Sequence, residues 1–285
     1  MLTYSCLKYG KVRMALHLAP PPDIIWDGIT RPETLTKEGM KLREDLANGA
    51  RDYDWPKVLA IVAEHPELVN AARPGGHSLY TPLHQAAHGG ASSEIVSKLL
   101  KYGAWRNARN AEGLRPLDVA RAKSHLHLQE ILTPACLQDV PAAVLSRIQQ
   151  HFHEVIRGRA AELVREHVLR LPELEVMLEF RPRKFWFPVP GMYGGFAYWW
   201  AYDGQNAKLI TESWCRVFGG SGQRHEITAS GSTLVDERVR LKGLDLAGAP
   251  RVVTRRLQVY ENMVALTGIE PESCRPMWSD VVVTG

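Results

Sequence analysis

The stretch TPLHQAAHGGASSEIVSKLLKYGAWRNARNAEGLRPLDVA, residues 81–120, repeats part of itself. Its Pro-Leu pair at position 82 returns at position 116, and Ala86 returns as Ala120, so the spacing is 34 residues in both cases. A fixed spacing in this range is typical of stacked supersecondary units. One such unit cannot bury its apolar face alone, so neighbouring units cover it and the stack offers an extended surface for binding.

The residue types in this stretch predict a pair of helices. Thr81 suits the N-cap of a helix, and Pro82 suits the first turn, where a missing N–H costs no hydrogen bond. Gly103 suits the end of the second helix, because glycine tolerates positive φ. We interpret His84 as a hydrogen-bonding residue of the turn, with metal binding or catalysis as the alternative. Small residues that allow close helix approach, and an apolar stripe at helical spacing, complete the pattern. They are Ala86, Ala87, Ile95, Val96, Leu99 and Leu100.

The same stretch resembles an ankyrin repeat at several spaced positions. The matching residues are Thr81, Pro82, Leu83, His84, Ala86, Ala87, Ile95, Val96, Leu99, Leu100, Gly103, Ala104, Asn107 and Gly113. The chain departs from the ankyrin pattern by one extra residue within 90–93, which we expect to lengthen the turn between the paired helices. The resemblance implies a stack of helix pairs that binds other proteins.

We expect about three repeat units, which is near the minimum for a stable stack. A complete unit covers 79–110, a second covers 113–132, and a degenerate unit precedes them. The predicted fold class is α+β: a short ankyrin-repeat α-solenoid, a helical connector, and then an antiparallel β-meander domain. The predicted divisions are an N-terminal extension (1–40), ankyrin repeats (41–135), a helical connector or cap (138–180), an antiparallel β module (181–245) and a C-terminal extension (246–285).

From Lys184 onward the sequence pattern changes to β. Alternation places four aromatic rings on one side of a predicted strand, and Asp203-Gly204 predicts a hairpin turn after it. The four are Phe196, Tyr198, Trp200 and Tyr202. We favour a core role for this aromatic face, and stacking of bases or sugars is the alternative. Residues 185–237 resemble a β module that follows short ankyrin arrays in uncharacterised bacterial proteins, and this resemblance implies no activity.

The composition of the 285-residue chain fits an intracellular soluble protein. A hydrophobic content of 45% is enough for sizeable cores, and a net charge of +4 is too small to imply nucleic acid by itself. The four cysteines are scattered without metal-ligand spacing, so we expect reduced thiols and no metal site. We find no apolar run of membrane-helix length and no signal peptide. We therefore expect a cytoplasmic location, no membrane association and no cofactor.

The β module holds one candidate ligand site, beside a glycine-rich turn. Its residues are Glu212, Trp214, Arg216, Arg224 and His225. We expect Arg216 to face His225 across a hairpin, on the same face as Glu212 and Trp214. Basic side chains beside glycine could bind an anion, but cross-strand pairs of this kind more often stabilise a sheet. No phosphate loop, metal cluster or catalytic residue is assigned.

The repeat surface holds the other candidate site, on the loops between repeats and the first helices. Its residues are Tyr80, His88, Trp105, Arg106 and Arg109. Trp105 stands where the ankyrin pattern has a small polar residue, so it requires either a packing neighbour or a partner. Our leading hypothesis is a non-enzymatic adaptor with a protein partner. The alternative is a β module that binds or processes a small anionic or nucleotide ligand; nucleic acid is not favoured, and the oligomeric state stays open.

Overall fold

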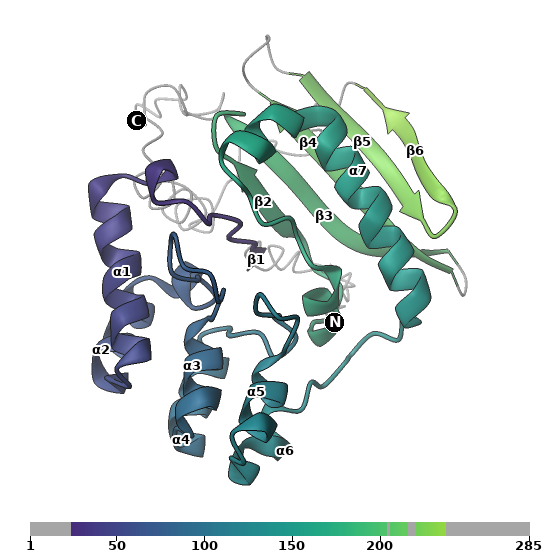
Figure 1. The fold of residues 1–285 in the computed structure, drawn as a ribbon. Coiled ribbons are helices and arrows are strands. Elements are labelled where there is room, and N and C mark those ends of the chain that lie inside the picture. The colour runs from purple at the N-terminus through teal and green to yellow at the C-terminus, as the bar shows by residue number, and fades with distance from the viewer. Residues whose placement is uncertain (1–23, 204–205, 216–220, 238–285) are drawn as a thin grey trace, which may run out of the picture.

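The computed structural model describes residues 24–203, 206–215 and 221–237. Helix pairs stand side by side below a sheet, and one long helix crosses a face of that sheet (Figure 1). The fold class is α+β, as predicted. The helices are α1 (Lys37–Arg51), α2 (Trp55–Glu64), α3 (Pro82–Gly89), α4 (Ser93–Lys101), α5 (Pro116–Ala122), α6 (Gln129–Leu132) and α7 (Ala142–Glu166). The 3₁₀ segments are η1 (Pro32–Thr34), η2 (Pro66–Leu68), η3 (Leu126–Leu128) and η4 (Leu174–Glu179). The strands are β1 (Ile24–Ile25), β2 (Phe185–Val189), β3 (Gly194–Asp203), β4 (Asn206–Cys215), β5 (Ser221–Thr228) and β6 (Gly231–Asp236).

Three successive helix pairs, α1/α2, α3/α4 and α5/α6, form the repeat stack. The Thr81 hydroxyl caps α3 and Pro82 occupies its first turn, as the sequence predicts. Gly103 follows α4 with a φ of 97°, a left-handed conformation that favours glycine. Gly90 lies in the same region at the turn between α3 and α4, with a φ of 62°. The local sequence therefore sets where each of these helices begins and ends.

His84 takes the structural role that the sequence favoured. Its side chain is fully buried, and Nε2 donates a hydrogen bond to the Leu114 carbonyl at 3.1 Å, which ties α3 to the loop before α5. Its Nδ1 lies 2.9 Å from the Thr81 hydroxyl oxygen. Burial lowers the pKa of His84 from 6.5 to about 4, against the opposing effect of the Leu114 bond. The imidazole is therefore neutral at pH 7 and serves as a fixed hydrogen-bonding group.

The six strands form one sheet in the order β1-β2-β3-β4-β5-β6. Strands β2 to β6 are an antiparallel meander, as predicted, and β1 pairs in parallel with β2. Residues 24–34, which the sequence analysis assigned to an extension, thus contribute to this domain. Asp27 and Arg43 form a buried ion pair that links the segment after β1 to α1.

One face of the sheet, called here the inner face, is covered by α7. Phe152 of α7 packs against Tyr198 of β3 with 4.9 Å between ring centroids. Phe196, Tyr198 and Trp200 are buried on this face, whereas Tyr202 is 45% exposed. The core role predicted for the aromatic face is therefore confirmed for three of its four rings. The connector helix covers the sheet and does not cap the repeats. Neither α7 nor any other helix in the described ranges is long and apolar enough to span a membrane.

The predicted register of the β4–β5 hairpin is wrong. His225 pairs with Thr211, and Glu226 pairs with Ile210. The predicted partner of His225, Arg216, lies outside the described residues. Burial accounts for the observed register, because the fully buried Leu209 and Ile227 are opposite each other on the inner face.

Candidate functional site

Side chains of the first two repeats form a continuous group of rings, called here the aromatic patch. It consists of Tyr53, Trp55, Tyr80 and His88. The Tyr53 hydroxyl lies 2.9 Å from Nδ1 of His88, and the rings of Tyr80 and His88 are 6.2 Å apart at an edge-to-face angle. Tyr53 is 42% exposed. The patch therefore presents amphipathic rings to solvent, the kind of side chain that is enriched at protein interfaces.

The position of Tyr53 depends on two local features. Its φ of 61° places it in the left-handed region at the turn between α1 and α2. Its ring lies over Gly89, where an added Cβ would collide with it. Tyr80 and His88 were selected from the sequence but Tyr53 was not; it lies 35 residues before His88, in the turn that corresponds to Gly90 of the next repeat.

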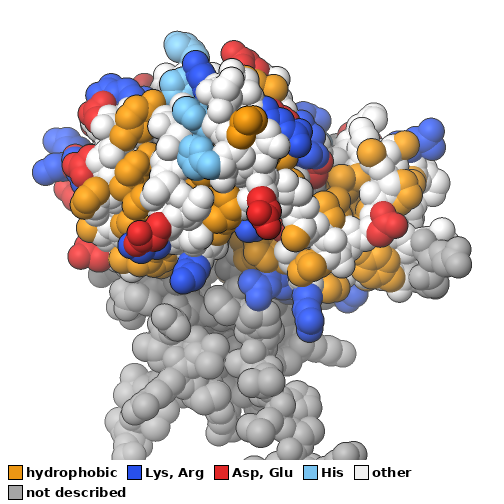
Figure 2. Space-filling view, turned by 90° about the horizontal axis from the view of Figure 1, so that it is seen from below, with side chains coloured by type: hydrophobic (Ala, Val, Ile, Leu, Met, Phe, Trp, Pro, Cys, Tyr) orange, Lys and Arg blue, Asp and Glu red, His pale blue; other side chains and the backbone are white. Residues whose placement is uncertain are grey.

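The underside of the stack carries a row of histidines (Figure 2). His125 Nε2 donates to the His88 carbonyl at 3.1 Å, and His127 Nε2 donates to the Ala91 carbonyl at 3.2 Å. Burial, followed by the charges of Lys123 and His125, lowers the pKa of His88. The side chains of His125 and His127 thus each join neighbouring repeats through a backbone carbonyl. In the described residues no group of three His, Cys, Asp or Glu side chains could hold a metal ion.

Trp105 is a core residue, so of the two explanations left open for it, packing within the chain holds and a surface for a partner does not. Its side chain is 4% exposed and stacks on Trp26 with ring centroids 5.3 Å apart. Arg170 lies over the same Trp26 ring, 5.3 Å from its centroid. Trp26 is 79 positions away from Trp105, in a segment with no repeat pattern.

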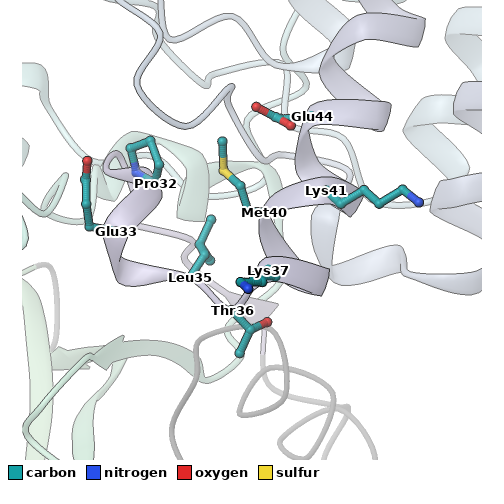
Figure 3. A pocket seen from close by; sticks show the side chains of 8 residues that line it. All are labelled: Pro32, Glu33, Leu35, Thr36, Lys37, Met40, Lys41 and Glu44. Atoms are coloured by element: carbon teal, nitrogen blue, oxygen red, sulfur yellow. The ribbon is translucent and has the colours of Figure 1, made fainter.

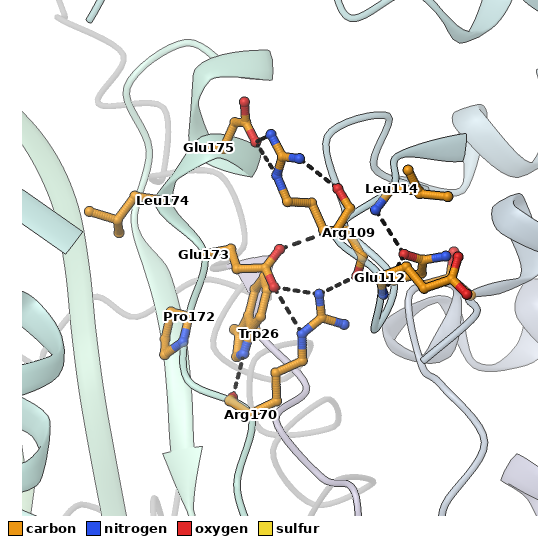
Figure 4. A network of polar contacts seen from close by, with 12 residues as sticks. Trp26, Arg109, Glu112, Leu114, Arg170, Pro172, Glu173, Leu174 and Glu175 are labelled. Carbon is orange, nitrogen blue, oxygen red and sulfur yellow. Dashed lines mark hydrogen bonds and ion pairs between the residues drawn. The ribbon is translucent and has the colours of Figure 1, made fainter. Parts of the chain in front are cut away.

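Arg109 is also bound within the chain, in a polar network (Figure 4). Its guanidinium contacts the Glu175 carboxylate at 2.8 Å, and Arg115 makes a second ion pair with the same carboxylate. Its backbone carbonyl accepts a hydrogen bond from Arg170 Nη2 at 2.5 Å, and Arg170 contacts Glu173 at the same distance. Ion pairs and hydrogen bonds therefore hold the loop before α5 against the segment that precedes β2.

Arg106 is held by the same segment. The Glu179 carboxylate accepts hydrogen bonds from the backbone N–H groups of Arg106, at 3.1 Å, and Asn107, at 2.6 Å. Burial raises the pKa of Glu179 above its ordinary value, and the two N–H groups oppose that shift. The Arg106 side chain donates to the Ile131 carbonyl at 2.8 Å. Three of the five predicted partner-binding residues, Trp105, Arg106 and Arg109, thus contact segments outside the repeat stack.

Comparison with known proteins covers the repeat region. The ankyrin repeat family model matches residues 78–111. The chain carries an ankyrin repeat. It is 50% identical over 60 residues to human ankyrin repeat and SOCS box protein 5, which is 20% of this chain and 18% of that relative. It is 40% identical over 82 residues to the Drosophila melanogaster ARF GTPase-activating protein Git, which is 28% of this chain and 11% of that relative. The chain therefore spans less than a fifth of the length of these relatives. The bacterial resemblance of the β module stays a prediction.

Beyond the ankyrin repeats, the predicted ligand site is divided between the two faces of the sheet. Glu212 pairs with Arg224 across β4 and β5, on the face opposite α7, called here the outer face. Glu212 also contacts Lys184 at 3.3 Å, and both Lys184 and Arg224 lie over the Trp199 ring. The Arg224 charge is therefore already compensated by Glu212, which lies 3.9 Å away.

The other members of the predicted ligand site do not join this pair. Trp214 is on the outer face with Glu212, two residues further along β4, and lies opposite Gly222. His225 lies on the inner face, because it pairs with the buried Thr211. Alternation along β5 thus separates Arg224 from His225, although both follow the same glycine-rich turn in the sequence.

A shallow, open hollow lies at the start of the helix stack, beside η1 and the first turn of α1 (Figure 3). Its lining residues are Pro32, Glu33, Leu35, Thr36, Lys37, Met40, Lys41 and Glu44. Apolar contacts come from Leu35 and Met40, and the charged side chains lie at the margin. The hollow has no convergent set of polar groups of the kind that fixes the orientation of a small ligand.

Proposed function

We propose that this protein is a non-enzymatic interaction module that binds a protein partner through the aromatic patch of its ankyrin repeats. The presence of an ankyrin repeat suggests protein–protein interaction in general. The observation that favours this particular surface is that the other predicted partner-binding residues contact the sheet domain. The loops that carry Trp105, Arg106 and Arg109 contact the sheet domain, whereas Tyr53 of the patch is exposed and its other three rings are half-buried.

The chemistry of the patch supports this proposal. Tyrosine and tryptophan provide large contact areas, keep a polar atom for hydrogen bonding, and lose little conformational entropy on binding. Tyr53 and His88 already hold each other at 2.9 Å, so part of the ordering cost of binding is met before a partner arrives. Acidic and basic side chains are mixed around the histidine row, which favours a protein surface over a polyanion (Figure 2).

The experiment that tests this proposal has two stages. A partner is first captured by the full-length chain, and its dissociation constant is then measured with purified components for the natural sequence and for Tyr53→Asn. Asparagine tolerates the positive φ at this position, so the substitution removes the ring with little backbone strain. The expected result is binding about tenfold weaker or more, the range for a hot-spot aromatic residue.

Tyr102→Ala is the matched control. Tyr102 is a tyrosine of similar exposure, 36%, that follows α4 and does not belong to the patch. Its replacement should leave the dissociation constant unchanged. If Tyr53→Asn and Tyr80→Ala both bind the partner as tightly as the natural protein does, the aromatic patch is not the binding surface and the proposal fails.

A further inference from the structure

The rings of the aromatic patch follow one another in a series across two repeats. Trp55, at the start of α2, has its ring centroid 6.1 Å from that of Tyr53, at an angle of 31° between the planes. Tyr53 contacts His88 near the end of α3, and the His88 ring is inclined at 65° to the Tyr80 ring. Neighbouring rings therefore do not stack flat on one another, and the surface of the patch is ridged.

Two hydrogen-bond donors of the patch have no partner among the residues that the structure describes. They are the indole N–H of Trp55 and the hydroxyl of Tyr80, and both side chains are half-buried. None of the four rings carries a charge at pH 7, because burial lowers the pKa of His88 from its ordinary value of 6.5. A ligand that matches the patch therefore offers neutral hydrogen-bond acceptors.

The backbone conformation of a bound peptide decides whether it can offer such acceptors. The carbonyls of an α-helix are bonded internally, so a bound helix would cover both donors and leave them unpaired, at a cost in desolvation. A β-strand needs the exposed edge of a sheet, whereas the patch lies on helices and loops. A polyproline II segment has no internal hydrogen bonds, so its carbonyls are free, and proline has no backbone N–H that needs a partner.

The charged residues beside the patch add a second requirement. Asp52 and Asp54 flank Tyr53 in the sequence, and both are exposed. Asp52 pairs with Arg51. The Asp54 side chain accepts a hydrogen bond from the Lys57 backbone N–H, but it forms no ion pair within the described part of the chain. The Asp54 carboxylate is therefore available to a cation of the partner, and it would repel a polyanion such as nucleic acid.

We propose that the partner segment bound by the aromatic patch is a proline-rich segment in the polyproline II conformation with a basic residue beside the prolines; this rests on the binding role proposed for the patch. The pyrrolidine rings pack between the inclined aromatic rings, and the carbonyls accept hydrogen bonds from Trp55 and Tyr80. The basic side chain pairs with Asp54. Both surfaces are stiff before they meet, since the polyproline II segment is preformed and Tyr53 and His88 already hold each other.

The test titrates the full-length protein with three synthetic peptides of equal length. One is an arginine followed by a run of prolines, one has glutamate in place of the arginine, and one alternates glycine and serine. Binding is followed by calorimetry and by the NMR signal of the Trp55 indole N–H. The arginine–proline peptide should bind saturably and shift the Trp55 signal. The glutamate–proline peptide should bind more weakly, and the glycine–serine peptide should not bind.

Two variants each remove one of the unpaired donors and keep an aromatic ring. Tyr80→Phe and Trp55→Phe should each weaken binding of the arginine–proline peptide about fivefold, the loss expected for one neutral hydrogen bond. Tyr102→Ala changes a tyrosine outside the patch and should bind the peptide as the natural protein does. Melting temperatures show whether each variant folds.

The proposal is overturned if neither proline peptide binds saturably, if binding leaves the Trp55 signal of the natural protein unmoved, or if the glycine–serine peptide binds equally well. Equal binding by both site variants and the control would overturn it as well, and so would glutamate–proline binding as tight as arginine–proline binding. The Trp55 readout needs no variant, so it decides the question even if a substitution impairs folding.

The same experiments separate this failure from a failure of the proposed function. If the proline peptides do not bind but Tyr53→Asn still weakens binding of the captured partner, the patch binds a partner of a different class. If Tyr53→Asn and Tyr80→Ala leave the affinity for that partner unchanged, the patch is not a binding surface and both proposals fail.

Discussion

The repeat stack and the sheet domain are built from different side chains. The buried core of the stack consists of leucine, valine and alanine, supplied at helical spacing by neighbouring units. The buried core of the sheet domain is rich in rings, including Trp26, Phe152, Phe187, Tyr198 and Trp200. The first core is made mostly between adjacent segments, whereas the second gathers residues that are far apart in the chain. A repeating pattern therefore indicates the first core directly and carries little information about the second.

Trp105 connects the two regions. It belongs to the repeat by sequence and to the sheet domain by packing, because its neighbours include Trp26 and the segment before β2. Glu173, Glu175 and Glu179 of that segment contact the same loop region of the repeats. The stack and the sheet domain thus share an apolar contact surrounded by polar ones, and each region's stability should depend on the other.

The largest effect is expected for Trp105→Ala. Removing this buried ring should lower the free energy of unfolding by about 3–5 kcal/mol, as for other large-to-small core changes. Because the ring belongs to the shared contact, hydrogen exchange should increase in β1 and β2 as well as in the loop after α4. Chemical denaturation and exchange of backbone amides measure the two effects. Unchanged stability would show that the repeats and the sheet domain are independent units.

Leu99→Ala tests the core of the repeat stack. Leu99 is fully buried in the aliphatic core of the stack, so its truncation should cost about 2–5 kcal/mol. The increase in amide exchange should be concentrated in α2, α4 and α6, with β3 and β4 little affected. An equal increase throughout the sheet would mean that the two regions unfold only as one unit.

Part of a pH-dependent loss of stability should come from His84 in the stack. The pKa of His84 is about 4 in the folded protein and 6.5 as the reference value, so the unfolded chain binds more protons between these values. Stability should therefore be complete above pH 6.5 and fall as the pH drops toward 4, by up to about 3 kcal/mol from this residue. Denaturation from pH 4 to 7 measures the slope. His84→Gln should have a shallower slope; identical slopes would contradict the assignment.

The smallest effect is expected in the sheet core, from Tyr198→Phe. This change removes one hydroxyl that is buried without a hydrogen-bond partner and leaves the ring packing in place. The variant should be about 1 kcal/mol more stable than the natural protein, since the desolvation cost of that hydroxyl disappears. Thermal melting measures the difference. A less stable variant would mean that the hydroxyl has a partner such as a bound water.

The candidate sites could be predicted only in part. Tyr80 and His88 were selected because they belong to a pattern with known spacing, whereas Tyr53 belongs to a degenerate unit and was not selected. His225 was selected for its chemistry beside Arg224, but the two side chains lie on opposite faces of the sheet. Arg216 was selected with it and falls outside the described residues.

The sequence by itself determined the local structure of this protein. Caps, glycines and apolar spacing define α3 and α4, and alternation with turn residues predicts the meander, because these signals act over a few residues. Only the tertiary structure decided that α7 covers the sheet, that Trp105 stacks on Trp26, and that Arg224 and His225 face opposite ways. Each of these depends on which distant segments bury one another, and the shift of a strand by one residue reverses every side chain on it.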